Sequence, residues 1–494
     1  MMPVIVQPED QFNRELVQKL HPADWQNPTP AGRYNMVVIG AGPAGLVAAA
    51  GAAGLGAKVA LVERHLMGGD CLNFGCVPSK ALLKAAHKAY DGGVIPDFSA
   101  VMKSLRQKRN HLAAHDSVAR FTELGIDVFL GDGHFVSPNC IEVGGKQLNF
   151  HRAVIATGAR AALPPIPGLK EASPLTNETL FSLEKLPRHL IVIGAGPIGC
   201  EMAQAFRRFG AEVTIIEMAD RLVPIEDPEA SAVLRTQFEK EGIDMVFGAK
   251  VVAVDKEGSH KKVTLMDGGV ERSITADEIL VAAGRIPNIE GLELEAAGVD
   301  HHRRGVTVND RLQTTSSKIY AAGDICSPYQ FTHSADAMAK IVIQNALFFG
   351  RKKTSDLVMP WATYTSPEIA HVGMTAAQAA EQGDRVITLT AQMSEVDRAV
   401  LDGETNGFAR AYVARGSGRI LGATMVSSHG GESIAEMGLA ITSGLKMSAV
   451  GATIHPYPTQ AEVWKRLANA YLKESFTPRI AKIFKIFLQL FSRK

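Results

Sequence analysis

Two stretches of the chain share one order of apolar and polar positions. The apolar run 36–39 leads into a glycine-rich turn, an alanine-rich helical stretch and a second apolar strand that ends in Glu63. The same order returns from residue 190 and ends in Glu217, 154 positions after Glu63. Short apolar strands that alternate with helices are typical of parallel sheets. We therefore expect an α/β fold with two similar domains.

The turn in each copy has the spacing of a dinucleotide-binding fingerprint. The copies read Gly40-Ala41-Gly42-Pro43-Ala44-Gly45 and Gly194-Ala195-Gly196-Pro197-Ile198-Gly199. In such a turn the first glycine turns the chain, the second lets the backbone approach a pyrophosphate, and the third packs helix on strand. The helix N-terminus stabilises the phosphate charge, and the acid that ends the second strand accepts hydrogen bonds from a ribose. Two copies in this context predict two dinucleotide sites.

The pattern changes near Thr365, where short strands with turn signals are followed by helical stretches. The last stretch, 477–491, places its apolar residues on one helical face, with Arg479, Lys482 and Lys485 off that face. A basic amphipathic helix of this kind either lies in an anionic membrane surface or covers apolar surface on its own dimer. The sequence leaves both open.

Composition adds limits to this picture. At about 150 residues per domain, 494 residues suggest about three domains. A net charge of +1 offers no general attraction for nucleic acid. Five cysteines make no disulfide framework, so we expect a reducing, cytoplasmic location. No apolar run reaches the roughly 20 residues that span a bilayer, and the acidic start is unlike a secretory signal or transit peptide.

Cys71 and Cys76 are the strongest candidates for chemistry, with four residues between them. A thiol pair exchanges two electrons with one disulfide. The first fingerprint leads directly to this pair, and a flavin suits that site because it passes electrons on from a hydride donor. Lys80 follows at a distance that brings a positive charge close to the cofactor. The other three cysteines, Cys140, Cys200 and Cys326, have no partner at metal-ligand spacing, so we expect no resident metal site.

The second fingerprint then holds the hydride donor. Glu217 would bind the ribose 2′-hydroxyl and repel a 2′-phosphate, which favours NADH over NADPH. Three arginines nearby in the sequence weaken this preference and leave NADPH open: Arg207, Arg208 and Arg221.

In these motifs the chain resembles the class I pyridine nucleotide-disulfide oxidoreductases, the family of dihydrolipoamide dehydrogenase, glutathione reductase and mercuric reductase. The resemblance runs from about residue 34 to 470. It implies FAD at the first fingerprint and a redox-active disulfide at the cysteine pair. Cys71 matches the thiol that exchanges with substrate, Cys76 the thiolate that lies against the flavin, and Lys80 the lysine near the reactive flavin nitrogen. Glu201 matches a glutamate near the nicotinamide.

Further positions match the segments around the flavin. Gly133 and His134 resemble the segment whose backbone contacts the adenine, and Asp324 matches the aspartate at the ribityl and pyrophosphate region. Thr157 and Gly158 match the passage from the FAD domain to the NAD domain, and Gly284 the return passage.

The resemblance also implies a domain order, in which the NAD domain is inserted into the FAD domain. In the family, a C-terminal α+β domain makes the homodimer and completes each active site with residues of the partner subunit, and the resemblance implies the same here. The expected parts are an N-terminal arm 1–33 with helical character and no catalytic content, FAD-binding 34–156, NAD(P)-binding 157–284, FAD-binding 285–355, dimerisation 356–470 and the C-terminal helix 471–494.

The completing segment, 455–462, departs from the family's His-Pro-Thr-x-x-Glu stretch. Aligning on Glu462 places Tyr457 at the histidine position, whereas taking His455 as the base requires Gln460 in place of the glutamate. We prefer the tyrosine alignment because it preserves more of the motif. A tyrosine is mostly protonated at neutral pH and is a poor base. A poor base at this position disfavours organic disulfides as acceptors. In this position the chain resembles mercuric reductase, although the C-terminus lacks that enzyme's vicinal cysteine pair.

The leading hypothesis is an enzyme that passes electrons from NADH through FAD and the cysteine pair to a metal ion or a disulfide. One alternative is a disulfide reductase of the dihydrolipoamide dehydrogenase type. A second is a membrane-surface NADH:quinone oxidoreductase, supported only by the C-terminal helix. The third is a catalytically silent nucleotide-binding regulator, which the intact motifs argue against.

Overall fold

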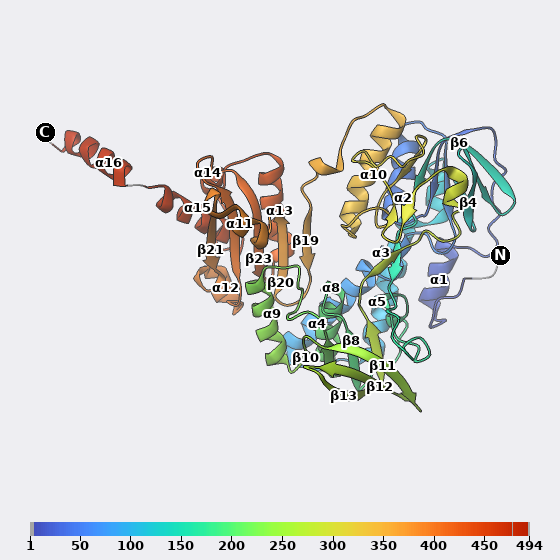
Figure 1. Cartoon of the computed structure of the whole chain (residues 1–494), viewed down its shortest axis with the longest axis horizontal. Helices are drawn as coiled ribbons and strands as arrows, with labels where there is room; N and C mark the ends of the chain where they lie inside the picture. Colours follow the sequence, from blue (N-terminus) through green and yellow to red (C-terminus); the bar gives the residue numbers. More distant parts are fainter. Residues whose placement is uncertain (1–3, 477, 493–494) are drawn as a thin grey trace. The chain divides into compact units, whose positions relative to one another are not determined.

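The structure is a computed structural model that describes residues 4–476 and 478–492. Its contacts divide the chain into two compact units (Figure 1). Unit 1 holds the residues up to 220 and Glu241–Leu357, and unit 2 holds Arg221–Lys240 and the residues from 358 onward. The domain bounds expected from the sequence divide the chain more finely and stay a prediction.

A parallel sheet lies at the centre of unit 1. The strands of this sheet and of its antiparallel extension are β1 Tyr34–Ile39, β2 Val59–Glu63, β3 Asp127–Leu130, β4 Gly133–Ser137, β5 Cys140–Val143, β6 Lys146–Ile155 and β18 Ile319–Ala321. The parallel order is β3-β2-β1-β6, with β18 also beside β6. β1 is almost wholly buried, as expected for a parallel strand covered on both faces. The first half of β6 instead pairs antiparallel with β5, which pairs with β4.

The second fingerprint opens a second parallel sheet in unit 1. Its strands are β8 His189–Ile193, β9 Glu212–Ile216, β10 Asp244–Val246 and β14 Glu278–Val281. They run parallel in the order β10-β9-β8-β14. The remaining strands of the unit form antiparallel pairs or sheets: β11 Lys250–Glu257, β12 His260–Asp267 and β13 Val270–Ala276; β7 Ala159–Ala161 and β15 Arg285–Pro287; and β16 His301–His302 and β17 Gly305–Val306. The two parallel sheets confirm the expected α/β fold class.

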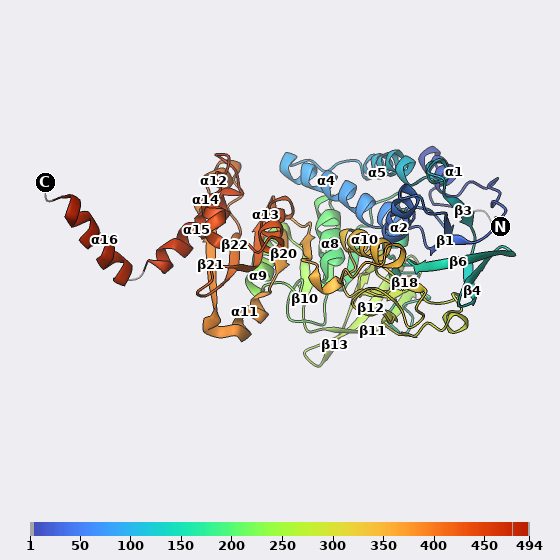
Figure 2. The ribbon, with the colours of Figure 1, turned by 90° about the horizontal axis from the view of Figure 1, so that it is seen from above.

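The helices of unit 1 join the strands of these sheets, and two of them, α2 and α8, begin within the fingerprints. They are α1 Gln11–Leu20, α2 Pro43–Gly54, α3 Gly69–Asn73, α4 Cys76–Gly92, α5 Phe98–Leu112, α6 Val118–Glu123, α7 Asn177–Leu180, α8 Pro197–Arg208 and α10 Thr332–Leu347. α2 and α8 each start with proline directly after the second fingerprint glycine, where the missing N–H has no helical acceptor to lose. α2 packs beside α10, and α4 packs beside α8 (Figure 2).

The N-terminal arm packs on the rest of unit 1. α1 begins after Asp10, whose side chain accepts a hydrogen bond from the backbone N–H of Asn13. Leu16 and Leu20 are fully buried in the same apolar cluster as Met36 of β1. The arm is therefore part of the core of this unit.

Unit 2 contains an antiparallel sheet and most of the C-terminal helices. The strands are β19 Pro360–Thr363, β20 Glu368–Gly373, β21 Val386–Gln392, β22 Phe408–Ala414 and β23 Ile420–Ser427, in the order β19-β20-β23-β22-β21. The helices are α9 Pro228–Glu241, whose last residue falls in unit 1, α11 Ala376–Gln382, α12 Asp397–Asp402, α13 Gly430–Thr442, α14 Met447–Ala452, α15 Glu462–Ser475 and α16 Pro478–Phe491. Inward residues of β21 alternate with exposed ones, as in a sheet with one covered face. The expected change to strands followed by helices is confirmed.

α16 lies in the stretch 477–491, of which the structure describes 478–491. None of its described residues is buried, and its large apolar side chains are exposed. Within the described part of the chain, no helix combines the length and the apolar character needed to cross a membrane.

Candidate active site

The glycines of the first fingerprint meet different neighbours. A Cβ on Gly40, which has a φ of +99°, would lie 2.3 Å from the carbonyl oxygen of Ala156. A Cβ on Gly45 would lie 1.8 Å from the carbonyl oxygen of Gly40. The nearest atom to a Cβ on Gly42 is 3.8 Å away, in Gly69. The first and third glycines are thus required by the protein, whereas the second leaves space, as a bound pyrophosphate needs.

The second fingerprint repeats this division. A Cβ on Gly194 would lie 2.6 Å from the carbonyl oxygen of Ala282, and one on Gly199 would lie 2.0 Å from that of Gly194. Nothing lies within 4 Å of a Cβ on Gly196. Both turns therefore offer an open second glycine at the start of a helix, and both fit a dinucleotide phosphate.

The acids that end β2 and β9 hold the fingerprint turns. Glu63 accepts a hydrogen bond of 2.7 Å from the backbone N–H of Ala41, and Glu217 accepts one of 2.6 Å from that of Ala195. Burial raises the pKa of Glu63, and its backbone hydrogen bonds act against this. Each acid is thus placed beside its turn, and contact with a ribose stays a prediction.

The two cysteines lie at the junction of two helices. Cys71 belongs to the short α3, and Cys76 is the first residue of α4. The structure describes both as thiols. A hydrogen bond from Cys71 lowers the pKa of Cys76 to about 6, and the Thr332 hydroxyl and the charge of Lys80 act in the same direction. The thiolate of this pair is therefore on Cys76.

Thr332 opens α10, and its Oγ1 lies 3.5 Å from the Sγ of Cys76. The hydrogen bond with Cys76, together with burial, raises the pKa of Cys71. The opposite directions of the two pKa shifts favour the negative charge on Cys76 and the proton on Cys71. Because thiol–disulfide exchange proceeds through a thiolate, the cysteine that keeps its proton must lose it before it reacts.

Lys80 joins the cysteine helix to the second fingerprint helix. Its Nζ lies 2.8 Å from Oε2 of Glu201 on α8. The Glu201 side chain is 5% exposed, whereas that of Lys80 is 37% exposed. The structure therefore brings together Lys80, Glu201 and the cysteine pair, which the sequence could relate only by resemblance.

An arginine that sequence reasoning did not assign connects two acids beside the pair. Nη2 of Arg285 lies 3.1 Å from Oδ2 of Asp70, and its Nε lies 3.5 Å from Oδ2 of Asp324. Burial raises the pKa of Asp324 to about 6, while Arg285 opposes the shift. Asp70 precedes Cys71, so this ion-pair chain extends from the predicted flavin residue to the redox motif. The sequence offered a signal for this arginine, because Arg285 directly follows Gly284 in the predicted return passage.

The passages between the sheets pair with each other. β7 and β15 form an antiparallel ribbon. The Thr157 hydroxyl donates to the carbonyl oxygen of Asn288 at 2.8 Å, and the backbone N–H of Asn288 donates to the carbonyl oxygen of Gly158 at 2.9 Å. Gly158 and Gly284 both have positive φ, at +66° and +106°. The two predicted passages thus lie side by side.

Gly133 and His134 begin β4. A Cβ on Gly133 would lie 2.8 Å from Cγ1 of Val62, the residue before Glu63. This segment therefore lies against the strand that carries the first fingerprint acid, where an adenine contact is expected.

The completing segment belongs to unit 2, so its relation to the cysteine pair stays a prediction. The Tyr457 side chain is 70% exposed, and its hydroxyl donates to Oδ2 of Asp397 at 2.9 Å. This hydrogen bond raises the pKa of Tyr457. Oε2 of Glu462 is buried and has no hydrogen-bond partner among the described residues. His455 faces Glu436 of α13, with Nε2 and Oε1 3.0 Å apart.

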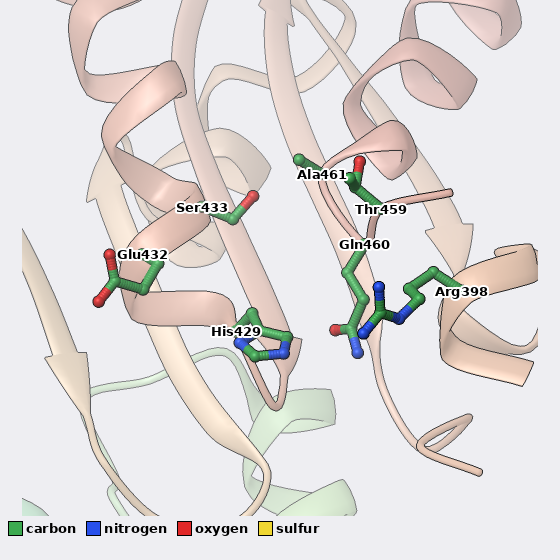
Figure 3. A pocket seen from close by; sticks show the side chains of 7 residues that line it. All are labelled: Arg398, His429, Glu432, Ser433, Thr459, Gln460 and Ala461. Carbon is green, nitrogen blue, oxygen red and sulfur yellow. The ribbon is translucent and has the colours of Figure 1, made fainter. Parts of the chain in front are cut away.

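A cavity of about 290 Å³ lies beside this segment within unit 2 (Figure 3). Gln460 points into the unit there, and its Nε2 donates to Glu404 and Ser428, each at 2.9 Å. The lining residues are Arg398, His429, Glu432, Ser433, Thr459, Gln460 and Ala461. The cavity thus lies between α13 and the approach to α15.

Family models match most of the chain. The model described as pyridine nucleotide-disulphide oxidoreductase matches residues 34–339. The model for the dimerisation domain of these enzymes matches residues 359–468, which supports a homodimer.

Relatives and solved structures agree with these matches. A mercuric reductase of Bacillus cereus is 38% identical over 89% of this chain and 72% of its own length. A dihydrolipoyl dehydrogenase of Thermus scotoductus is 35% identical over 90% of this chain and 98% of its own. A Cu(II) complex of the HOCl-induced flavoprotein disulfide reductase RclA from Escherichia coli has a TM-score of 0.81, at 30% identity over 87% of this chain and 99% of that one. The chain belongs to the pyridine nucleotide-disulphide oxidoreductase family, whose enzymes use FAD and NAD(P)H.

Proposed function

We propose that this enzyme passes electrons from NADH through FAD to a Cys71–Cys76 disulfide and on to a metal ion or a disulfide, with a soft metal ion preferred. The observation that carries this proposal is the surroundings of the thiol pair: Oγ1 of Thr332 lies 3.5 Å from the Sγ of Cys76, Lys80 follows on the same helix, and both lower the pKa of Cys76. A bound flavin supplies the passage of an electron pair from a hydride donor to sulfur.

The residues of the chain do the rest. One NADH converts the disulfide into the Cys71 thiol, the Cys76 thiolate and NAD⁺, with no further proton needed. Lys80 and Thr332 stabilise the Cys76 thiolate that results, because both lower its pKa. With an organic disulfide, the Cys71 sulfur displaces one thiol, to which the Cys71 proton passes, and Cys76 then displaces the second as a thiolate and closes the Cys71–Cys76 disulfide again. With Hg(II), both sulfurs bind the ion, the Cys71 proton passes to water, and two electrons reduce the ion to the metal as the disulfide closes.

The preference for NADH rests on Glu217. Its Oε2 already accepts the backbone N–H of Ala195 at the second fingerprint, which places a carboxylate beside the turn. A carboxylate there accepts a ribose hydroxyl and repels a phosphate. Arg207 is turned away, because its Nε donates to the carbonyl oxygen of Glu241 at 2.7 Å. Arg208 is paired with Glu241 in a buried ion pair, so neither weakens the preference.

The preference for a metal ion rests on Tyr457 in a site shared between two subunits. The hydrogen bond to Asp397 raises the pKa of Tyr457, so this residue is a poor proton acceptor at neutral pH. His455 and Gln460, the residues of the other alignment, are both engaged inside unit 2. A soft metal ion needs thiolates and no base, whereas an organic disulfide needs a group to move its protons. Relatives named mercuric reductase support the same choice.

An acceptor panel tests this proposal. NADH oxidation is followed anaerobically with Hg(II), Cu(II), lipoamide, glutathione disulfide and quinones, each with wild type and a Cys71→Ser variant. We expect the highest kcat/KM with a metal ion and its loss in the variant. Preference for lipoamide supports the dihydrolipoamide dehydrogenase alternative. Quinone turnover that survives Cys71→Ser supports direct transfer, and no turnover at all supports a silent regulator.

We also propose that this enzyme is cytoplasmic and that α16 holds it at an anionic lipid surface. Between Ile480 and Phe491 the apolar side chains are 38% to 71% exposed, so the face is open. Lys482, Lys485 and Gln489 fall together on the other face, and the described residues after Glu474 include no acid. Charge and an exposed aromatic face together are typical of helices that lie in a lipid interface. α16 also begins after residue 468, where the dimerisation model ends.

Vesicle flotation tests the lipid contact. Wild type, a chain ending at residue 476 and a Lys482→Glu, Lys485→Glu variant are floated with vesicles of phosphatidylglycerol and phosphatidylcholine, and with phosphatidylcholine alone. We expect wild type to float only with the anionic vesicles and both variants to remain at the bottom of the gradient. If wild type does not float and truncation breaks the dimer, α16 covers the dimer instead and the proposal is wrong.

A further inference from the structure

One buried arginine joins the N-terminal arm to the turn between the two cysteines. Arg109 on α5 is 2% exposed. Its Nη1 donates to the carbonyl oxygen of Asn73 at 2.7 Å, and its Nη2 donates to Oδ1 of Asn13 at 2.6 Å. Asn73 ends α3, between Cys71 and Cys76. Asn13 lies in the arm, before the residues that the family model matches.

The arginine depends on these two acceptors. Burial lowers the pKa of Arg109 to about 10, so the guanidinium is still charged at neutral pH. A buried cation is costly unless its N–H groups are hydrogen-bonded. Its Nε is buried without a hydrogen-bond partner in the described part of the chain. The hydrogen bonds of Nη1 and Nη2 therefore offset more of the cost of burying the charge.

The amide of Asn13 has only one useful orientation. A guanidinium can only donate, so the amide oxygen faces Arg109, and the Nδ2 group donates to the carbonyl oxygen of Pro8 at 2.8 Å. The arm therefore presents a fixed acceptor to the arginine.

Asn73 is held through both its backbone and its side chain. Arg109 binds its carbonyl oxygen, while its side chain donates to the carbonyl oxygens of Met67 at 3.1 Å and Gly69 at 2.9 Å. A Cβ on Gly69 would lie 2.6 Å from Cα of Gly42, the open glycine of the first fingerprint. The turn that carries Cys71 is thus fixed against both the arginine and the phosphate turn.

The arm also lies along the segment that leads to the cysteines. The backbone N–H of Met67 donates to the carbonyl oxygen of Leu20 at 3.4 Å, and the ring of His21 binds the carbonyl oxygen of His65. Leu16 and Leu20 share an apolar cluster with Leu72, the residue after Cys71. These contacts are independent of the arginine and connect the same two segments.

We propose that Asn13 and Arg109 are positioning residues for the Cys71–Cys76 pair, and that the N-terminal arm is therefore a working part of the reaction. This inference rests on the proposed function of the pair. A disulfide closes only when the two Cβ atoms approach to about 4 Å, so the turn must hold Cys71 close to Cys76 in both redox states. Without the Asn13 acceptor, Arg109 shifts to find another, and the Asn73 carbonyl moves with it.

The test compares three variants in the full-length holoenzyme. Asn13→Leu removes the acceptor, Asn13→Asp keeps an acceptor oxygen, and Lys19→Met is the matched control. Nζ of Lys19 also joins α1 to α5, through Asn110 at 2.7 Å and 2.9 Å, but does not reach α3. The readouts are kcat, the melting temperature and the pH at which alkylation of the reduced pair by iodoacetamide is half-maximal.

We expect Asn13→Leu to lower kcat about 10- to 100-fold and to move the alkylation midpoint to higher pH. Asn13→Asp should restore kcat to within about threefold, since the acceptor is the feature that matters. Lys19→Met should lower the melting temperature as the leucine variant does, but keep kcat and the midpoint. If Asn13→Leu leaves both unchanged, or if Lys19→Met matches its losses, the arm is only a structural support.

One further variant and the alkylation midpoint keep the outcomes distinct. If the leucine variant does not fold, Asn13→Ser, which keeps a polar side chain but shortens its reach, is measured in its place against the same criteria. The alkylation midpoint reports the geometry of the thiols without turnover. A shifted midpoint in a protein whose cysteines take no electrons from NADH would therefore retain the positioning role and reject the proposed function.

Discussion

Nζ of Lys80 lies 2.8 Å from Oε2 of Glu201. This contact joins the helix that starts at Cys76 to the helix that starts at Pro197, within the second glycine fingerprint. A charged lysine is thereby kept close to the cysteine that holds the thiolate.

Replacing Lys80 by methionine should make the Cys76 thiolate harder to form. The Cys76 pKa is about 6, so alkylation of the reduced wild type should be half-maximal near pH 6 and fall as the pH is lowered. Loss of the positive charge should move this midpoint up by about one pH unit. Lys84→Met, an exposed lysine on the same helix, is the control and should leave the midpoint near 6. Equal midpoints in wild type and Lys80→Met would remove Lys80 from the site.

Two glycines of the second fingerprint should respond differently to alanine. Gly196 has no atom within 4 Å of its Cβ position, so Gly196→Ala should fold with nearly unchanged stability but raise the KM for NADH at least tenfold. Gly199→Ala forces a Cβ to within 2.0 Å of a carbonyl oxygen and should cost about 1–3 kcal/mol of unfolding free energy. Thermal unfolding and steady-state kinetics measure both. A normal KM in Gly196→Ala would place the nucleotide elsewhere.

Glu217→Ala should change the choice of nucleotide. Removing the carboxylate takes away the repulsion of a 2′-phosphate, so kcat/KM for NADPH should rise relative to NADH by about tenfold. The backbone N–H of Ala195 also loses its acceptor, so kcat/KM for NADH should fall. Glu212→Ala, an exposed acid on the same strand, is the control. Unchanged selectivity in Glu217→Ala would mean that another group selects the nucleotide.

Tyr457→His should favour organic disulfides. A histidine has a pKa near 6.5 and can move protons at neutral pH, so reduction of lipoamide or glutathione disulfide should rise about tenfold or more. Tyr457→Phe, which removes only the hydroxyl and its hydrogen bond to Asp397, should not raise it. If wild type already reduces lipoamide as fast as Tyr457→His, the tyrosine alignment or its chemistry is wrong.

The sequence was sufficient for the fold class because the apolar runs and the fingerprints follow directly from the period of strands and the space around glycine. Gly40 and Gly45 were predicted to turn the chain and to pack the helix on the strand, and at both positions a Cβ would lie against a carbonyl oxygen. The α16 helix was also predictable, since its apolar positions recur at helical spacing.

The partners of the site residues could not be predicted in this way. Arg285 and Asp70 are 215 positions apart, and Thr332 is 256 positions from Cys76, so only the folded chain relates them. The arm shows the same limit. The sequence indicated a helix without catalytic content, whereas the contact of Asn13 with Arg109 depends on a helix almost 100 positions away. Local patterns carry no information about such pairs.

The electron capacity of the enzyme tests the central claim most directly. Anaerobic titration with NADH counts the electrons taken up by wild type and by the Cys71→Ser, Cys76→Ser double variant. A disulfide and a flavin each take two electrons, so wild type should need about two equivalents of NADH for full reduction and the double variant about one. Wild type should also show the long-wavelength absorbance of a thiolate beside the flavin after the first equivalent. Full reduction of both proteins by one equivalent would contradict a redox-active Cys71–Cys76 pair.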